Sequence, residues 1–143
     1  MLREVTASRR LMGRLPQGAD LLEALNELCA RENITAGEVK AIGALTKAAL
    51  GFYNQNSREY EYVTLDQHLE IVSLLGDVSL KDGQPFVHAH VALGDGQGRL
   101  WGGHLAPGSE VFACEVMLTV YETPEPFERG FDQGTGLLLW PMQ

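Results

Sequence analysis

Three of the four histidines in the chain lie within a stretch of seventeen residues, as His88, His90 and His104. Imidazole nitrogens bind Zn²⁺ and other divalent transition metals, so this spacing raises the question of a metal site. Residues 86–93 alternate apolar side chains with histidine or small residues, a period of two that predicts a strand. Residues 99–105 can form the partner strand, because the glycines between the two segments favour a chain reversal.

The register of this hairpin decides whether the three imidazoles meet. A loop centred on Gly96 places His88 directly opposite His104. The same register places His90 opposite Gly102, one diagonal away from His104. Because side chains alternate between faces, all three histidines then project to one side. Directly opposed Cβ atoms are roughly 5 Å apart and diagonal ones roughly 7–8 Å, while Zn–N bonds are about 2.0–2.1 Å. The sequence therefore predicts a three-histidine site for zinc or another divalent transition metal.

Other interpretations of the same residues stay open. A single β-bulge in the hairpin would turn His104 to the opposite face. Histidines in strands are often hydrogen-bonded structural residues, so the short spacing of His88 and His90 is a weak indication by itself. A third histidine on the same face favours the metal site, and Gly102 and Gly103 leave room beside the imidazoles.

Two further titratable residues are considered with the triad. Glu115 lies in the otherwise apolar run Phe112–Leu118, and a buried carboxylate is costly unless it is paired or binds a cation. Glu115 is a candidate for a fourth metal ligand, for a hydrogen-bond partner of an imidazole, or for a general base. The equally supported alternative is that it faces outward from an edge strand. His68 begins a strand beside polar residues and is expected on the surface, apart from the other histidines.

One helix is expected near the start of the chain, after the break at residues 15–18. Asp20 can cap it, and Glu23 completes a variant of the capping box. An apolar stripe at helical spacing predicts that one face packs on the core, and the helix is expected to end near Asn33. The stripe consists of Leu21, Leu22, Leu25, Leu28 and Cys29.

The remainder of the chain alternates short apolar runs with turn residues, which predicts antiparallel strands. The expected strands cover residues 3–14, 39–45, 48–53, 60–65, 69–75, 86–93, 99–105 and 111–121, with residues 137–140 as a further candidate. Gly76 and Asp77 are expected to end one of them, and residues 129–136 to be irregular surface chain. The fold class is therefore α+β: a mainly antiparallel sheet of about seven or eight strands with one principal helix.

Length and composition indicate one globular domain over residues 1–143. The apolar content is 45% and the charged content 21%, which is ordinary for a soluble protein. No apolar run reaches the length of a membrane helix, and the first residues lack the apolar core of a signal peptide, so a cytoplasmic location is expected.

Cys29 and Cys114 fit no paired motif and are expected to be reduced, buried thiols.

The net charge of −8 bears on the choice of partner. Nucleic-acid affinity comes largely from basic residues that neutralise phosphates, so an acidic domain is a poor candidate for DNA binding. Arg3, Arg9, Arg10 and Arg14 are four of the eleven basic residues and could form a local positive strip. The alternative, favoured here, is the solvated face of a first strand.

The chain resembles the plants and prokaryotes conserved (PPC) domain. The blocks that carry the resemblance are Gly43–Leu45, Leu50–Tyr53, Leu74–Ser79, Pro85–His90, Gly102–Leu105 and Glu115–Val116. They follow the order of the family and extend from about Arg9 to Tyr121. One departure is visible, because the family often has Gly-Asn where this chain has Gly76-Asp77. This difference is expected to be a small change within a turn.

The resemblance implies a fold, an assembly and a site. The fold is an antiparallel sheet with a packed helix, assembled as a homotrimer, and the residues matching His88, His90 and His104 hold a metal that is usually taken as zinc. Plant members carry an AT-hook beside the domain, and stand-alone prokaryotic members are often described as DNA-binding. The hook is absent here. The fold is also similar to that of acetolactate decarboxylase, a zinc enzyme, although a shared fold does not establish shared chemistry.

Three functions follow as hypotheses. The first is a trimeric metal-binding module that acts through assembly or a small-molecule ligand. The second is a zinc-dependent lyase or hydrolase, with Glu115 as acid or base and Arg99 or Lys47 as an anchor for a substrate carboxylate. The third is DNA binding through the arginines of residues 3–14. The sequence favours the first.

Overall fold

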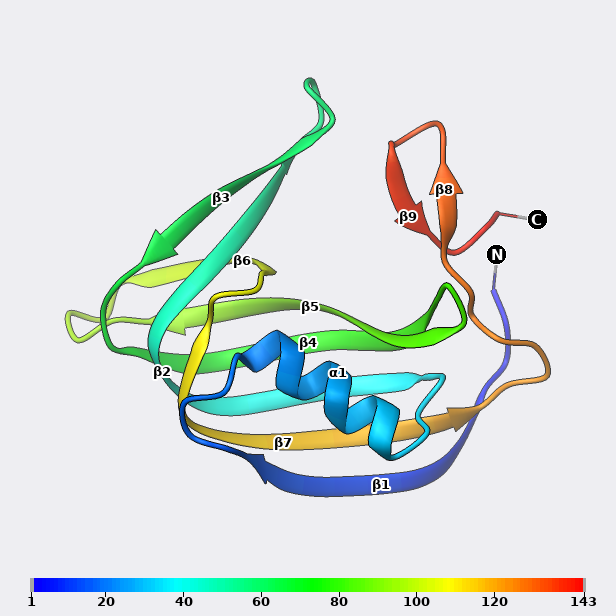
Figure 1. The fold of residues 1–143 in the computed structure, drawn as a ribbon, viewed down its shortest axis with the longest axis horizontal. Coiled ribbons are helices and arrows are strands. Elements are labelled where there is room, and N and C mark those ends of the chain that lie inside the picture. Colours follow the sequence, from blue (N-terminus) through cyan, green and yellow to red (C-terminus); the bar gives the residue numbers. More distant parts are fainter. Residues whose placement is uncertain (1, 143) are drawn as a thin grey trace.

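The fold is an antiparallel sheet with one helix packed on it, as the sequence predicts (Figure 1). The computed structural model describes residues 2–142, and this range contains one helix and nine strands. Their order is β1 (Thr6–Leu15), α1 (Leu21–Arg31), β2 (Gly37–Asn54), β3 (Glu59–Leu65), β4 (Leu69–Lys81), β5 (Gln84–Gly94), β6 (Leu100–Leu105), β7 (Glu110–Glu122), β8 (Gly130–Asp132) and β9 (Leu137–Leu139).

Seven of the strands form one sheet. Its order is β1-β7-β2-β4-β5-β6, with β3 paired to β2 outside this path, and every pairing is antiparallel. Strand β2 also pairs with β6, so β2, β4, β5 and β6 close on one another. Strands β8 and β9 make a separate two-stranded hairpin near the C-terminus (Figure 1).

Helix α1 begins where the capping residues predict. The carboxylate of Asp20 accepts a hydrogen bond from the backbone N–H of Glu23 at 3.0 Å, which satisfies one of the free donors at the helix start. The helix ends at Arg31, and Asn33 has a positive φ of 54° just beyond it. At 11 residues, this helix of the described chain is not long and apolar enough to cross a membrane.

The apolar face of α1 packs on the alternating buried residues of the sheet. Leu21, Leu25 and Cys29 are fully buried there, together with Cys114 of β7. Burial raises the pKa of both thiols to about 11, so they are un-ionised at neutral pH. Both cysteines are free, as predicted, and serve as small apolar core residues.

Two predicted runs, residues 39–45 and 48–53, turn out to be a single bent strand. Strand β2 continues through both of them, with register shifts near Gly43 and Leu45 where β-bulges interrupt the ladders. Bulges bend a strand without ending it. The first part of β2 pairs with β4 and β7, and the second part pairs with β3 and β6.

Two predicted boundaries are wrong. Strand β4 does not end at Gly76 but runs on to Lys81, and the chain reverses at Asp82 and Gly83, whose φ values are 52° and 72°. Such a two-residue reversal is typical of a tight hairpin. Residues 129–136, expected to be irregular, contain β8, which pairs with β9. Three-residue strands carry too little periodicity to be recognised from sequence.

Candidate metal centre

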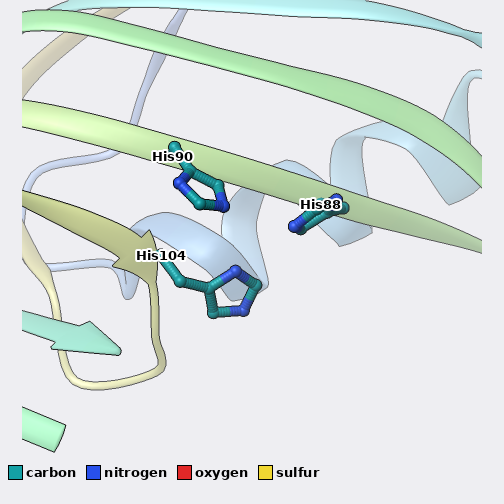
Figure 2. A group of neighbouring side chains, drawn as sticks. All are labelled: His88, His90 and His104. Atoms are coloured by element: carbon teal, nitrogen blue, oxygen red, sulfur yellow. The ribbon is translucent and has the colours of Figure 1, made fainter. Parts of the chain in front are cut away.

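The structure brings His88, His90 and His104 together on one face of the sheet. Figure 2 shows a nitrogen of each ring turned toward the space between the three rings. One potential ligand nitrogen from each residue lies within 4.8 Å of the others. Ring centroids are 5.3 Å apart for His88 and His90, 5.1 Å for His88 and His104, and 5.5 Å for His90 and His104. The predicted cluster therefore exists, although its detailed register differs from the prediction.

The observed register is shifted by two residues. His90, not His88, lies directly opposite His104, and Gly102 lies opposite Ala92. The pairs His90–His104 and Gly94–Leu100 centre the hairpin loop on Gln97. Within this loop, Asp95 accepts hydrogen bonds from the backbone N–H groups of residues 97 and 99. A register shift of two residues makes His90 the direct partner of His104 and His88 the diagonal one. It leaves every side chain on the same face of the sheet.

The burial of His104 controls its protonation. Burial, followed by the charges of His88, His90 and Arg129, lowers the pKa of His104 to about 4. Burial and the charge of His88 also lower the pKa of His90. A metal requires neutral imidazole, so low pKa values favour the ligand form of these rings at neutral pH.

The donor set fits a divalent transition metal. Nδ1 of His104 is buried and has no hydrogen-bond partner, which is unusual for a buried polar atom and is consistent with a ligand that would satisfy it. Ligand bonds of about 2.0–2.1 Å require nitrogens roughly 3.4 Å apart in a tetrahedral arrangement. The ligand nitrogens lie within 4.8 Å of one another, at most about 1.4 Å beyond that separation.

Asp77 belongs to the site, although no sequence pattern predicted it there. It lies in β4 directly opposite His88, and its Oδ2 is 3.4 Å from Nδ1 of His88. A carboxylate at Nδ1 orients the ring and leaves Nε2 for a metal. Burial raises the pKa of Asp77, but hydrogen bonds and charges from His88 and Arg129 outweigh that effect and hold the pKa below its usual value. The departure at this position therefore lies at the centre of the site and not in a turn.

Arg129 links the C-terminal segment to this carboxylate. Its Nη2 donates to Oδ1 of Asp77 at 2.7 Å, and its Nε donates to the hydroxyl of Ser79 at 2.9 Å. Its side chain is only 5% exposed, and its guanidinium lies 5.4 Å from the ring centre of Phe86 and 5.7 Å from that of Trp140. No local pattern marks Arg129, because its partners are about 50 residues away in the sequence.

Glu115 lies apart from the cluster. It occupies β7 opposite Ile42 of β2 and Arg14 of β1, and its side chain is exposed. The strand order places three strand spacings between β7 and β5, or about 14 Å along the sheet. That separation exceeds hydrogen-bond reach to His88 or His90 of the same chain, so within one chain Glu115 neither ligates beside them nor exchanges protons there.

The other predicted residues also lie elsewhere. His68 is exposed and outside the cluster, as expected. Arg99 is paired with Asp95 at 2.7 Å in the hairpin loop, and Lys47 lies 3.7 Å from Glu110. Neither basic residue is positioned to anchor a carboxylate at the histidines.

The two glycines beside His104 have different roles. Gly102 shares the face of His104, but Gly103 points to the other side, where a Cβ would lie 2.9 Å from the carbonyl oxygen of Gly51. Gly103 therefore permits the close approach of β6 to β2, and the expectation that it leaves room beside the imidazoles is wrong. On the outer side of His104, the ring of Tyr60 lies 5.1 Å away.

Comparison with known proteins gives a family and several relatives. The family model described as the Plants and Prokaryotes Conserved (PCC) domain matches residues 2–122. Two curated proteins from Synechococcus strains, each described as bifunctional protein GlmU, are 36% identical over 87% of this chain. The chain spans about a fifth of the length of these relatives, with 19% of each covered.

Solved structures match over nearly the entire chain. One, described as a metal-containing protein from Archaeoglobus fulgidus, is 42% identical with a TM-score of 0.93, and the match covers 99% of both chains. Another, a plant- and prokaryote-conserved (PPC) protein from Pyrococcus horikoshii, is 36% identical with a TM-score of 0.93, covering 100% of this chain and 98% of the other. Both likenesses extend through the C-terminal residues that contribute Arg129.

Proposed function

The chain belongs to the Plants and Prokaryotes Conserved domain family, and from this premise we propose that it is a metal-binding protein whose His88, His90 and His104 bind a divalent transition metal, most suitably zinc. The observation that carries the proposal is the convergence of three imidazoles around the unpartnered, buried Nδ1 of His104. The metal-containing description of the Archaeoglobus fulgidus protein, which is 42% identical, supports the same conclusion.

Three neutral ligands suit an open coordination site. The cluster contains no cysteine or carboxylate among the described residues that could close the shell as a fourth ligand. Structural zinc sites have four protein ligands, whereas sites that bind substrates or small ligands keep one position free. We therefore assign the site to ligand binding rather than to holding the fold together.

Metal content tests this proposal. Purified protein, stripped with a chelator and reloaded with Zn²⁺, is expected to hold one metal ion per chain by elemental analysis. The His88→Ala variant is expected to lose most of it, whereas His68→Ala, which removes an exposed histidine outside the cluster, is expected to retain it. Equal metal content in wild type and His88→Ala would contradict the proposal.

We also propose that the protein works as a homotrimer. The face of the sheet that carries the histidines also exposes apolar side chains on neighbouring strands: Met12 is 85% exposed, Ile42 48% and Leu75 58%. Leu75 lies directly opposite His90, so these apolar side chains reach the edge of the candidate metal centre, with the charged Lys40 and Glu115 exposed among them. Large apolar side chains exposed together on one face are typical of a protein interface.

A zinc-dependent lyase or hydrolase is the second candidate. The open position favours it, because a bound metal there would polarise a substrate carbonyl or activate water. The chain's own residues contribute less than the sequence analysis expected, since Glu115 is too far away within the same chain. A catalytic acid or base would therefore have to come from the residues around His104, such as Tyr60, whose ring centroid lies 5.1 Å from that of His104.

DNA binding is disfavoured by the arginines themselves. Arg3 is paired with Glu125 at 3.0 Å, and Arg9 lies 3.7 Å from Glu32. Within residues 2–142, only Arg10 and Arg14 of the strip have no acidic side chain within 4.0 Å. Two positive charges on a chain of net charge −8 provide little phosphate neutralisation. No retention on duplex DNA is expected at about 150 mM salt, and salt-sensitive binding there would contradict this view.

A further inference from the structure

A cavity beside the candidate metal centre has the chemistry of a ligand pocket. It has a volume of about 320 Å³ and lies between β3 and the β8–β9 hairpin. His88 and His104 line one side of it, so a molecule in the cavity can reach the open position of a metal held by these residues. Pockets for small ligands are typically about 300–1,000 Å³, so the volume suits a small molecule.

The walls of this hairpin cavity are mostly apolar and aromatic. Tyr60 and Phe86 line it, together with Leu137 and Leu139 of the C-terminal hairpin. The hairpin is held in place at its base by Arg129 and at its tip by Arg58, which donates to the carbonyl oxygens of residues 133 and 134 at 3.2 Å. The cavity is thus formed by two hairpins that are fixed to each other and not by loose chain.

The charge of the hairpin cavity is opposite to that of the protein. The chain carries 19 acidic and 11 basic residues, yet the described residues that line the cavity include two arginines, Arg58 and Arg129, and no acidic side chain. Asp77, which neutralises part of the charge of Arg129, is not among its lining residues. A divalent metal at the histidines would add to the positive field, so an anionic group is favoured where the cavity meets the metal.

We infer that the hairpin cavity binds a small organic carboxylate, whose carboxylate group takes the open metal position while its apolar body lies against Tyr60, Phe86 and the leucines. This inference rests on the proposed metal site. A neutral ligand would gain nothing from the two arginines, and an inorganic anion would leave the apolar walls unused. Two larger cavities fit an anionic ligand less well. The cavity of about 410 Å³ between β1 and α1 has no histidine among its described lining residues. The cavity of about 350 Å³ beside His88 and His90 is lined by the carboxylates of Glu38 and Asp77, which disfavour an anion.

The test uses full-length protein loaded with Co²⁺, whose visible absorption reports changes in coordination. Uptake of Co²⁺ is read first, and its absence would overturn the metal site and this inference together. Acetate, propionate and butyrate are then titrated at constant ionic strength. Affinity is expected to rise about fourfold per added methylene, the effect of burying one CH₂ group. Butyramide and inorganic phosphate are expected to bind at least tenfold more weakly than butyrate.

Two variants of Arg129 separate the effect of its positive charge on ligand binding from the effect of its shape. Arg129→Gln is expected to weaken butyrate binding at least tenfold in Co²⁺-loaded protein, and Arg129→Lys, which keeps the charge, to weaken it less. Arg31→Gln removes an exposed charge from α1, away from the face that carries the histidines, and is the control, with no change expected. Equal affinity for acetate and butyrate, binding of butyramide as tight as butyrate, or a spectrum that no carboxylate alters would overturn the inference while leaving the metal site intact. The wild-type series needs no variant, so it decides the question even if Arg129→Gln does not fold.

Discussion

At the scale of single residues, Asp77 determines how His88 is held. Its carboxylate lies between His88 Nδ1 and the guanidinium of Arg129, at 3.4 Å and 2.7 Å respectively. A carboxylate at this position fixes both the tautomer and the direction of the ring. An amide in its place would retain the shape of the side chain but lose the negative charge. That charge attracts Arg129 and favours the tautomer of His88 that carries its proton on Nδ1.

The variant Asp77→Asn is therefore expected to weaken metal binding by about 10- to 100-fold, the usual effect of removing a hydrogen-bond partner of a ligand. The measurement is competition for Zn²⁺ against a chromophoric chelator. Asp82→Asn is the matched control, because it removes the same charge from an exposed turn that tolerates asparagine at positive φ. Equal affinities in both variants would show that Asp77 does not orient His88.

The metal-free protein is expected to lose stability in acid through His104. Its pKa is about 4 in the folded chain and near 6.5 when unfolded. Between these values the unfolded chain binds more protons, so the free energy of unfolding falls as the pH decreases from about 6.5 to 4, by at most about 3 kcal/mol. Burial lowers the pKa of His90 as well, which acts in the same direction.

Urea unfolding at pH 7 and pH 4.5, with chelator present, measures this effect. The His104→Gln variant is expected to show a smaller loss than wild type over the same interval, because glutamine does not titrate. His68→Gln serves as the control and should behave as wild type. Identical pH dependence in His104→Gln and wild type would mean that His104 is not held neutral by the fold.

The triad could be predicted from sequence because the face that each histidine occupies depends only on whether its position is odd or even. His88, His90 and His104 are all even-numbered along one hairpin, so an error of two in the register left them on the same face. Asp77 was missed for a related reason: β4 was predicted to end at Leu75, six residues before its observed end at Lys81, which left Asp77 out of the ladder opposite His88. Arg129 could not be found, because its contacts depend on a C-terminal hairpin without sequence periodicity.

At the scale of elements, the close approach of β4 and β5 depends on Gly76. A Cβ at this position would lie 2.6 Å from the carbonyl oxygen of His88 and 2.8 Å from Cβ of Ala89. Both neighbours belong to the ladder itself, so neither can move aside cheaply. The glycine that resembled a strand terminator is instead what permits the strand to continue beside the metal centre.

Gly76→Ala is expected to lower the free energy of unfolding by about 1–3 kcal/mol, the usual cost of overpacking. It should also weaken Zn²⁺ binding, because the displaced backbone carries His88. Gly96→Ala is the matched control: a Cβ at Gly96 meets nothing within 4 Å, and a change within about 0.5 kcal/mol is expected. Urea unfolding of the two variants measures the difference, and equal midpoints would contradict the close-approach argument.

Strand β2 connects the two halves of the fold. Local sequence divides it at Thr46 and Lys47, where polar residues interrupt the apolar pattern, yet the bulges there let it pair with β4 and β7 before the bend and with β3 and β6 after it. This path brings β6, and with it His104, back beside β2. Which strands meet across such a bend is determined by tertiary packing, which is why the closure was not predictable from periodicity.

At the scale of the whole molecule, the register links the metal centre to the far edge of the sheet. One row of directly paired residues crosses the sheet from β6 to β1. It consists of His104 (β6), His90 (β5), Leu75 (β4), Lys40 (β2), Met117 (β7) and Met12 (β1). The histidines therefore lie at one end of a row across this surface of the sheet, which carries Leu75, Met117 and Met12 together with the charged Lys40. Covering that surface with a second copy would change the surroundings of the metal as well as hiding Met12 and Leu75.

Ile42→Glu is expected to break the proposed trimer. Ile42 is 48% exposed on β2, on the face that carries the histidines, and a carboxylate buried there without a partner would be costly. Light scattering coupled to size exclusion is expected to give three times the chain mass for wild type and a lower mass for Ile42→Glu. Val63→Glu makes the same chemical change at a similar exposure of 51% on β3, outside this surface, and is expected to leave the mass unchanged. A single-chain mass for wild type would contradict the trimer without affecting the histidine site, since all three ligands come from one chain.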